Sequence, residues 1–190
     1  MNWYTSDWHL NETRITQEFN PFFRPFQSIE EQNNIIISNC NKFVNENDTL
    51  YHLGDVSIDI DGISLLSKLK VKKRILIVGN YDEDKLSELG NHFDDVQISL
   101  NTNINNEIYH LNHYPVLADN TKMNIVGHIH GLWKVQPRII NVGVDAWHFQ
   151  PIDENRITFI TNAMRKFYDK NVFPLLNSFE LKQFQVSLEK

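Results

Sequence analysis

Acidic, imidazole and amide side chains follow a series of short apolar runs in this chain, at the points where predicted strands end. They occur in the segments SDWH, GDV, GNYD, NHYP and GHIHG, and the candidate ligands are Asp7, His9, Asp55, Asn80, His113, His128 and His130. Ligands gather at such positions because a sheet leaves a crevice beyond its strand ends. A mixed nitrogen and oxygen set suits divalent ions such as manganese, iron, zinc or nickel, rather than calcium or a thiolate site. The pattern therefore predicts a metal centre.

Each segment alone is weak evidence for such a site. An aspartate after a glycine is most often a turn residue, and a lone histidine before Tyr114 and Pro115 is by default a loop histidine. GHIHG is more specific, because two histidines at i and i+2 between glycines leave backbone room for an ion. The order and spacing of all five segments together favour the metal centre over separate structural roles.

The segments that must position these side chains alternate between predicted strands and helices. Strands are predicted at residues 2–6, 49–54, 74–79, 96–100, 107–112, 123–127 and 138–144, and helices at residues 29–44, 63–70 and 83–89. The run from Ile75 to Val78 has no polar alternate, as expected of a strand buried on both faces. Ser28 followed by Glu31 is a capping-box pattern that starts the first helix. The tail from Asp153 onward is expected to be partly helical, with a break at Phe173 and Pro174.

Taken in order, the segments form the pattern D-x-H, G-D, G-N-x-D, H and G-H-x-H, which resembles the signature of calcineurin-like metallophosphoesterases. The likeness covers about residues 1–152. It is closest to small, single-domain bacterial and phage members, through RPF (24–26), DTLYHLGD (48–55) and INVGVDAW (140–147). The resemblance implies an α/β fold, a four-layer αββα sandwich with two mixed sheets, as one domain over residues 1–190 with a helical tail at about 153–190.

The resemblance also implies how two divalent ions would be held. One ion would bind Asp7, His9, Asp55 and His130, and the other Asp55, Asn80, His113 and His128, with Asp55 as the bridge. Manganese is the first expectation, and iron, zinc and nickel are alternatives. Two cations about 3.5–4 Å apart can share a carboxylate and a hydroxide, lower the pKa of that water and neutralise charge on a phosphoryl group. The implied activity is hydrolysis of a small phosphoester, by a phosphodiesterase or phosphatase, with nucleotides among the candidate substrates.

The chain departs from the family pattern at Tyr81. In the family, a histidine after the motif asparagine donates the leaving-group proton and the next acid orients it. Here the pair is Tyr81 and Asp82, which together with Asn80 and Asp55 form the predicted catalytic set. A phenol with a pKa near 10 is a weaker donor at neutral pH than an imidazolium with a pKa near 6.5, and loss of a general acid costs about 10²–10⁴ in rate. Other candidate donors are His52, for which a packed or supporting role is preferred, and His92, His148 and Tyr114.

One arginine and several tryptophans remain to be assigned. Arg24 in FRPF is the predicted contact for a substrate phosphate, with an ordinary surface arginine as the equal alternative. For Trp8, Trp133 and Trp147 a place in the core is preferred to stacking on a base.

The composition of the chain limits the alternative functions that remain. The 190 residues carry a net charge of −6, which disfavours nucleic acid and hence a nuclease of the same fold. The other alternative, a non-catalytic interaction scaffold, predicts lost metal ligands.

With Cys40 as the one cysteine, no disulfide can form within the chain. No apolar run approaches the roughly 20 residues needed to span a bilayer, and the start lacks a signal-peptide pattern, so the expected location is the cytoplasm. Oligomeric state is left open.

Overall fold

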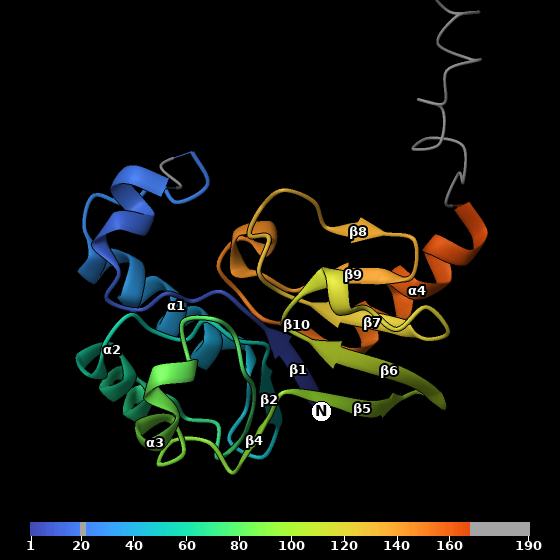
Figure 1. Ribbon diagram of the computed structural model, residues 1–190, viewed down its shortest axis with the longest axis horizontal. Helices are drawn as coiled ribbons and strands as arrows, with labels where there is room; N and C mark the ends of the chain where they lie inside the picture. Colours follow the sequence, from blue (N-terminus) through green and yellow to red (C-terminus); the bar gives the residue numbers. More distant parts are fainter. Residues whose placement is uncertain (20–21, 168–190) are drawn as a thin grey trace, which may run out of the picture.

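Two five-stranded mixed sheets form the centre of the computed structural model, which describes residues 1–19 and 22–167 (Figure 1). The first sheet has the order β10-β1-β2-β3-β4, with β1 to β4 parallel and β10 antiparallel to β1. Its strands are β1 (Asn2–Thr5), β2 (Thr49–His52), β3 (Lys73–Ile77), β4 (Asp95–Gln97) and β10 (Ile152–Asp153).

The second sheet has the order β5-β6-β7-β9-β8, in which β6, β7 and β9 are parallel and the two edge strands antiparallel. Its strands are β5 (Ser99–Ile104), β6 (Glu107–Asn112), β7 (Met123–Val126), β8 (Val135–Gln136) and β9 (Ile139–Asn141). The α/β fold with two mixed sheets is therefore confirmed.

Helices flank the pair of sheets unequally. Those grouped beside the first sheet, on the left of Figure 1, are α1 (Ile29–Phe43), α2 (Ile60–Ser64) and α3 (Leu86–Leu89). On the opposite side lies α4 (Glu154–Phe167), which contacts β10 and β1. Single turns complete the described chain: the π-helical η1 (Ile15–Phe19) and the 3-10 turns η2 (Leu65–Lys68), η3 (Glu83–Lys85), η4 (Pro115–Leu117) and η5 (Val144–Trp147).

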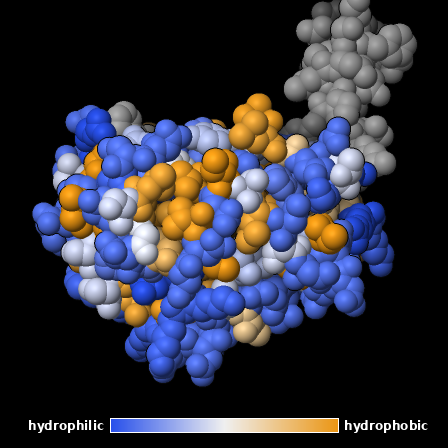
Figure 2. Space-filling model, turned by 60° about the horizontal axis from the view of Figure 1, so that its bottom comes forward, coloured by the Kyte–Doolittle hydropathy of each residue, from blue (hydrophilic) through white to orange (hydrophobic). Residues whose placement is uncertain are grey.

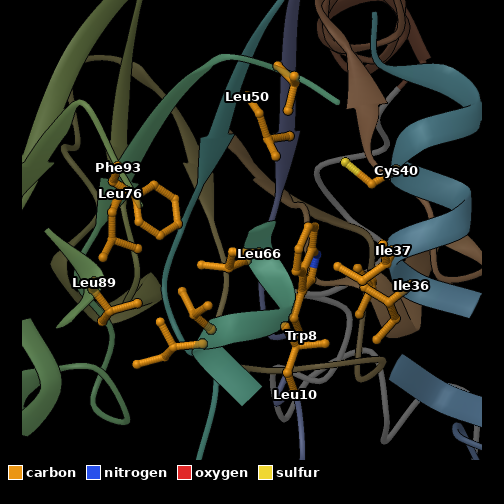
Figure 3. Packing of buried hydrophobic residues seen from close by; sticks show 14 of the residues in the cluster. Trp8, Leu10, Ile36, Ile37, Cys40, Leu50, Leu66, Leu76, Leu89 and Phe93 are labelled. Atoms are coloured by element: carbon orange, nitrogen blue, oxygen red, sulfur yellow. The ribbon is translucent and has the colours of Figure 1, made fainter. Parts of the chain in front are cut away.

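One apolar core lies between the first sheet and its helices. Figure 3 shows Trp8 between Leu66 and the α1 residues Ile36 and Ile37. The indole N–H of Trp8 donates to Thr5 Oγ1 at 2.7 Å, so the ring can be buried without an unsatisfied donor. Trp8 thus occupies the core, as predicted, and fixes the segment that carries two of the candidate ligands.

The second core lies between the two sheets. Successive residues of a strand point to opposite faces, so Leu50 joins the core on the helix side and Tyr51 the core between the sheets. Tyr51 stacks on Tyr4 of β1 with ring centroids 5.1 Å apart. Tyr109 of β6 donates its buried hydroxyl to Thr161 of α4 at 2.9 Å. The last helix is thereby joined to the same core.

Most predicted elements are confirmed, and one strand prediction is wrong. Residues 96–100 are not one strand: β4 ends at Gln97 in the first sheet, and β5 starts at Ser99 in the second. Ile98 between them is 78% exposed, because the chain turns there from one sheet to the other. The predicted helix at 63–70 begins earlier, since Asp59 caps α2 by accepting from the Gly62 N–H at 2.7 Å, and it finishes as η2.

The ends of the other helices follow their sequence signals closely. Ser28 Oγ accepts from the Glu31 N–H at 3.2 Å, as the capping box predicts. In return, the Glu31 carboxylate accepts from the Gln27 N–H, one residue before the capping serine. The tail prediction is met as far as α4, whereas the break at Phe173 and Pro174 lies outside the described residues.

The face of the protein shown in Figure 2 is mainly hydrophilic. On the face shown in Figure 2, apolar residues emerge in separate groups among polar ones. Within residues 1–19 and 22–167, none of the helices has the length and apolar character needed to cross a bilayer.

Candidate metal centre

The seven predicted ligands lie beyond the carboxyl ends of five strands. Asp7 and His9 follow β1, Asp55 follows β2, Asn80 follows β3, His113 follows β6, and His128 and His130 follow β7. Because β1, β2 and β3 are parallel neighbours, as are β6 and β7, each set of strand ends meets at one edge of its sheet. Direct contacts then join the two edges: Ser6 pairs with Gly143, and the His128 N–H donates to Asp7 Oδ1 at 2.9 Å.

Six of the seven ligands form two groups whose side-chain atoms are close enough to hold an ion each. Asp7, His9 and His130 form one group, and Asp55, His113 and His128 form the other, with ligand atoms within 4.8 Å of one another in each. The Asp55 carboxylate lies between the groups. Its Oδ2 is 3.5 Å from His9 Nε2 and 3.4 Å from His113 Nε2. This is the position that a bridging carboxylate requires.

Three histidines of the site are held through the same ring nitrogen. His9 Nδ1 lies 2.9 Å from Glu12 Oε2, His113 Nδ1 lies 2.6 Å from Leu53 O, and His130 Nδ1 lies 2.9 Å from Asp145 Oδ2. An acceptor at Nδ1 places the ring proton there and leaves Nε2 as a free lone pair, which is the usual arrangement of metal-binding histidines.

The Nε2 atoms of His9 and His113 are buried without a hydrogen-bond partner. Buried polar atoms are almost always paired, so orphaned nitrogens aimed at a shared carboxylate need an explanation. A divalent ion bound at each group supplies it. The residues present therefore fit a metal centre.

The backbone of the ligand loops is held in an uncommon conformation. Five ligands have positive φ angles: Asp7 (58°), His9 (47°), Asp55 (58°), His128 (74°) and His130 (52°). Left-handed backbone is rare outside glycine and costs about 1–3 kcal/mol at each strained residue. Such strain clusters where a site demands particular side-chain directions.

Two glycines give Asp55 and His113 the space they occupy. Gly54 has φ of +91°, and a Cβ there would lie 2.5 Å from His113 Nδ1. A Cβ on Gly79 would lie 2.4 Å from Asp55 Oδ1. Larger residues at these positions would displace the carboxylate or the imidazole.

Charge in the site reflects the pairing of Asp55 with the histidines. Burial would raise the pKa of Asp55, but the nearby charges of His113 and His9 lower this pKa to about 2. Burial would lower the pKa of His113, but Asp55 and Asp7 raise it to about 9. In the protein without metal, the imidazole of His113 is therefore favoured in its charged form beside Asp55.

Asp82 does not have the role that the resemblance implies. Its carboxylate accepts from the backbone N–H groups of Asp55, Val56 and Gly79, each at 2.9 Å. Its side chain is fully buried, so the carboxylate joins the turn after β2 to the turn after β3. It is a positioning residue for Asp55 and is not turned toward Tyr81 as an orienting acid.

Two tyrosines flank the two groups. The ring of Tyr81 meets that of His9 edge-on at 4.7 Å, and the Tyr81 N–H donates to Asp55 Oδ1 at 2.9 Å. The ring of Tyr114 lies 4.8 Å from His113 and 4.9 Å from His128. Burial, together with nearby carboxylates, raises the pKa of both phenols. Both are therefore neutral hydrogen-bond donors and weak acids.

Asn80 is adjacent to the site through its chain neighbours. It stands between Gly79, which packs against Asp55, and Tyr81, whose N–H donates to Asp55. The residue itself is exposed.

The prediction that Arg24 contacts substrate phosphate is wrong. A guanidinium has five N–H donors, and all five are used inside the protein. Nε and Nη2 bind Asp145 at 2.7 and 2.8 Å, Nη1 donates to Trp8 O and Gln32 Oε1, and Nη2 also donates to Asp7 O. Arg24 is 0% exposed and instead holds the chain on both sides of the first ligand.

Sequence reasoning missed two acids of the site, Glu12 and Asp145. Burial would raise the pKa of the Asp145 carboxyl, but Arg24 and His130 hold this pKa far below its ordinary range. Glu12 also has a lowered pKa, because the bond and charge of His9 and of Arg14 outweigh its burial. The sequence features that could have identified these two acids were weak. Glu12 stands three residues after His9, and Asp145 stands in the segment INVGVDAW.

The remaining candidate donors lie apart from the two groups. His52 is fully buried between Trp8 and Phe93, with ring centroids at 4.8 and 6.3 Å, so the packed role is confirmed. His148 is exposed in the loop before β10. His92 follows α3 on the helix side of the first sheet.

Comparison with known proteins supports the fold more than the activity. No model of a protein family matches the chain. An uncharacterized protein of Methanocaldococcus jannaschii is 35% identical over 89 residues, which is 41% of this chain and 44% of that relative. The match thus spans less than half of the relative's length.

A solved structure is similar over a larger part of the chain. A protein of unknown function from Aquifex aeolicus matches with a TM-score of 0.70 and 25% identity, covering 84% of this chain and 98% of that one. An archaeal phosphodiesterase covers 75% of this chain and 81% of its own at 15% identity, with a TM-score of 0.42. A likeness as remote as the last does not bear on function.

Proposed function

We propose that this protein is a metal-dependent hydrolase of phosphoesters that uses two divalent ions, with manganese as the first candidate and iron, zinc and nickel as alternatives. The observation that carries the proposal is the position of Asp55 Oδ2 between two buried, unpaired imidazole nitrogens, those of His9 and His113. A dinuclear site supplies Lewis acidity to phosphoryl oxygens and lowers the pKa of a shared water.

Residues around the two groups fix the orientation of the candidate metal ligands. Glu12, the Leu53 carbonyl and Asp145 each fix an imidazole through Nδ1, so that its Nε2 faces the site. Asp82 holds the backbone of Asp55 and thereby the direction of the bridging carboxylate. Rigid ligands of this kind preserve ion spacing and reduce the reorganisation needed when a phosphoester binds.

Neutral donors favour an anionic substrate. Four imidazoles and one amide stand beside two carboxylates, so the ligand set does not become strongly anionic around a phosphate. Asn80, Tyr81 and Tyr114 add N–H and O–H groups at the accessible side of the site. We infer that these groups bind phosphoryl oxygens or the leaving-group oxygen, while the raised phenol pKa values limit proton donation.

The test combines metal analysis with turnover. Protein treated with a chelator and then given manganese, nickel, zinc or magnesium is assayed on nitrophenyl phosphate and bis(nitrophenyl) phosphate. We expect about two ions per chain and turnover that the chelator abolishes. Single- and double-stranded DNA serve as substrates for the nuclease alternative. A protein that binds no ion under any of these conditions would support the scaffold alternative and contradict the proposal.

A further inference from the structure

Large apolar side chains are exposed on two segments that carry candidate ligands and on a third that precedes Arg24. Phe22 is 95% exposed, Val116 88% and Leu132 73%, and Phe23 and Leu117 are exposed as well. We call these five residues the apolar rim. Leu132 follows His130 by two residues, and Val116 follows His113 by three. Single exposed apolar residues are ordinary, but a group beside a site is characteristic of ligand contact.

Residues of the apolar rim stand on either side of the turn that holds His128 and His130. On one side, the Phe23 ring packs on Gly131, since a Cβ placed there would lie 2.7 Å from it. On the other side, Tyr114 contacts His128 at 4.9 Å, and η4 with Val116 and Leu117 begins directly after Tyr114. The rim thus reaches the neighbours of both ligand groups: Gly131 next to His130, and Tyr114, which contacts His128.

The rim offers little to a charged ligand. Residues 114–118 and 129–133 contain no Asp, Glu, Lys or Arg. Arg24, which follows Phe23, has all five donors engaged within the protein. A second phosphate, as in a nucleoside diphosphate, would find no cation on these segments. An apolar group would instead remove water from exposed Phe, Leu and Val side chains, which is favourable at about 25 cal/mol per Å².

From this we infer that the substrate is a phosphoester of an apolar alcohol, whose hydrocarbon part lies on the apolar rim while its phosphate lies at the two ligand groups. The inference rests on the proposed function and narrows it to a substrate class. It selects this class over nucleotides because the rim continues directly from the site and carries no charge.

Binding of alkylphosphonic acids tests the inference independently of turnover. Their dissociation constants, from methyl to octyl and below micelle formation, are measured calorimetrically on the full chain loaded with manganese. We expect affinity to rise about threefold to fourfold for each methylene that the rim buries. Phe22→Ser, Val116→Ser and Leu132→Ser should weaken octylphosphonate binding severalfold and leave methylphosphonate binding unchanged.

Matched controls come from exposed apolar residues elsewhere on the protein. Ile98 lies between β4 and β5 and Phe159 lies on α4, and both are as exposed as Leu132. Ile98→Ser and Phe159→Ser should not change the dependence on chain length. An equal loss in these controls would overturn the inference, because the effect would not belong to the rim.

Three further outcomes would also overturn it, each for a different reason. If nitrophenyl esters were hydrolysed but phosphonate affinity did not depend on chain length, the rim would have no role in substrate binding. The proposed function would then still hold. If phosphonate affinity depended on chain length but no phosphoester were hydrolysed, both the substrate inference and the proposed function would be wrong. A dimer that sedimentation detects in the wild type, and that the rim substitutions dissociate, would show that the rim binds a second copy instead.

Discussion

Asp145 Oδ2 lies 2.9 Å from His130 Nδ1, and the same carboxylate binds the Arg24 guanidinium through both of its oxygens. The side chains of Arg24 and Asp145 are both 0% exposed. A buried guanidinium needs a compensating charge, and a metal-binding histidine needs a fixed ring. One aspartate meets both needs, so the stability of the fold and the geometry of the site depend on the same residue.

Asp145→Asn should therefore affect both properties. Asparagine keeps the shape but leaves the Arg24 charge uncompensated, so the free energy of unfolding should fall by about 3–5 kcal/mol. Without a carboxylate to fix His130 through Nδ1, the metal affinity of the site should fall by about 10–100-fold. Urea unfolding in chelator measures the first effect, and titration with manganese measures the second.

The control for this change is Asp84→Asn. Asp84 pairs with Lys85 at the surface, where its carboxylate is 80% exposed. Exposed pairs contribute about 0–1 kcal/mol, so stability should change little and metal affinity should not change. Equal effects of the two substitutions would contradict the role assigned to Asp145.

The two candidate groups were predictable from the sequence because each of their residues stands at a strand end in a segment with its own pattern. The supports were not, because they act across the fold: Arg24 reaches Asp145, which lies 121 residues further along the chain. An arginine looks the same in sequence whether its donors meet a substrate or the protein. For the same reason the sequence did not reveal the role of Asp82. Its three backbone partners come close to it only when the turns after β2 and β3 lie side by side in the fold.

Asp55→Asn should abolish activity and lower metal content. Asparagine can still accept from the Tyr81 N–H, so the turn is kept, but a neutral amide is a poor bridge between two cations. Elemental analysis and turnover of nitrophenyl esters are the measurements. Full occupancy by two ions in this variant would be incompatible with a bridging role.

His128→Ala and His130→Ala should each remove one ion and leave the other. The two residues belong to different ligand groups although they are only two positions apart. Both have left-handed backbone angles and are separated by Ile129. Metal stoichiometry distinguishes this from a shared ion, for which both substitutions would have the same effect, and activity should fall sharply in both.

His52 should make the protein sensitive to mild acid. Burial lowers the pKa of His52 to about 3, below its ordinary value near 6.5. As pH falls below about 6.5, the unfolded chain takes up this proton and the folded protein does not. The stability is therefore complete above pH 6.5 and is lost progressively toward pH 3, by about 2 kcal/mol at pH 5.

His52→Phe tests this dependence, since a phenyl ring keeps the packing on Trp8 and Phe93 and cannot take up a proton. Between pH 7 and 5, in chelator, the variant should lose about 2 kcal/mol less unfolding free energy than the wild type. His148→Asn is the control, because His148 is exposed and asparagine tolerates its left-handed backbone. If His52→Phe and the wild type lost stability in parallel, the proton of His52 would not be responsible.

The presence of the predicted strands was easier to infer than their length or the path between them. The strand predicted at 138–144 is β9, which spans only Ile139–Asn141. Ile98 is apolar, so the sequence from 96 to 100 reads as one strand. Its exposure shows that the chain changes sheets at this residue, an event decided by the packing of the two sheets. The two-residue strands β8 and β10 were missed for a related reason, since segments so short carry no periodicity.

Tyr81 decides which leaving groups the site should release well. Its hydroxyl is a weak acid, because burial and the charge of Glu12 raise the phenol pKa. Expulsion of an aryl oxide needs little protonation, and expulsion of an alkoxide needs much more. Tyr81→Phe removes only the hydroxyl, since the N–H bond to Asp55 belongs to the backbone and a phenyl ring can still meet His9.

Tyr81→Phe should therefore change the turnover of a nitrophenyl ester by less than about tenfold, below the about 10²–10⁴ that loss of a working general acid costs. Tyr81→His should favour alkyl esters more than aryl esters. The gain should be modest, because the Asp82 carboxylate is engaged by three backbone N–H groups and does not orient the new ring. Rates of both variants on paired aryl and alkyl esters provide the measurement. If Tyr81→Phe lost as much activity on the aryl ester as Asp55→Asn, the phenol would be essential to catalysis, and the ions and their ligands would not account for the reaction without it.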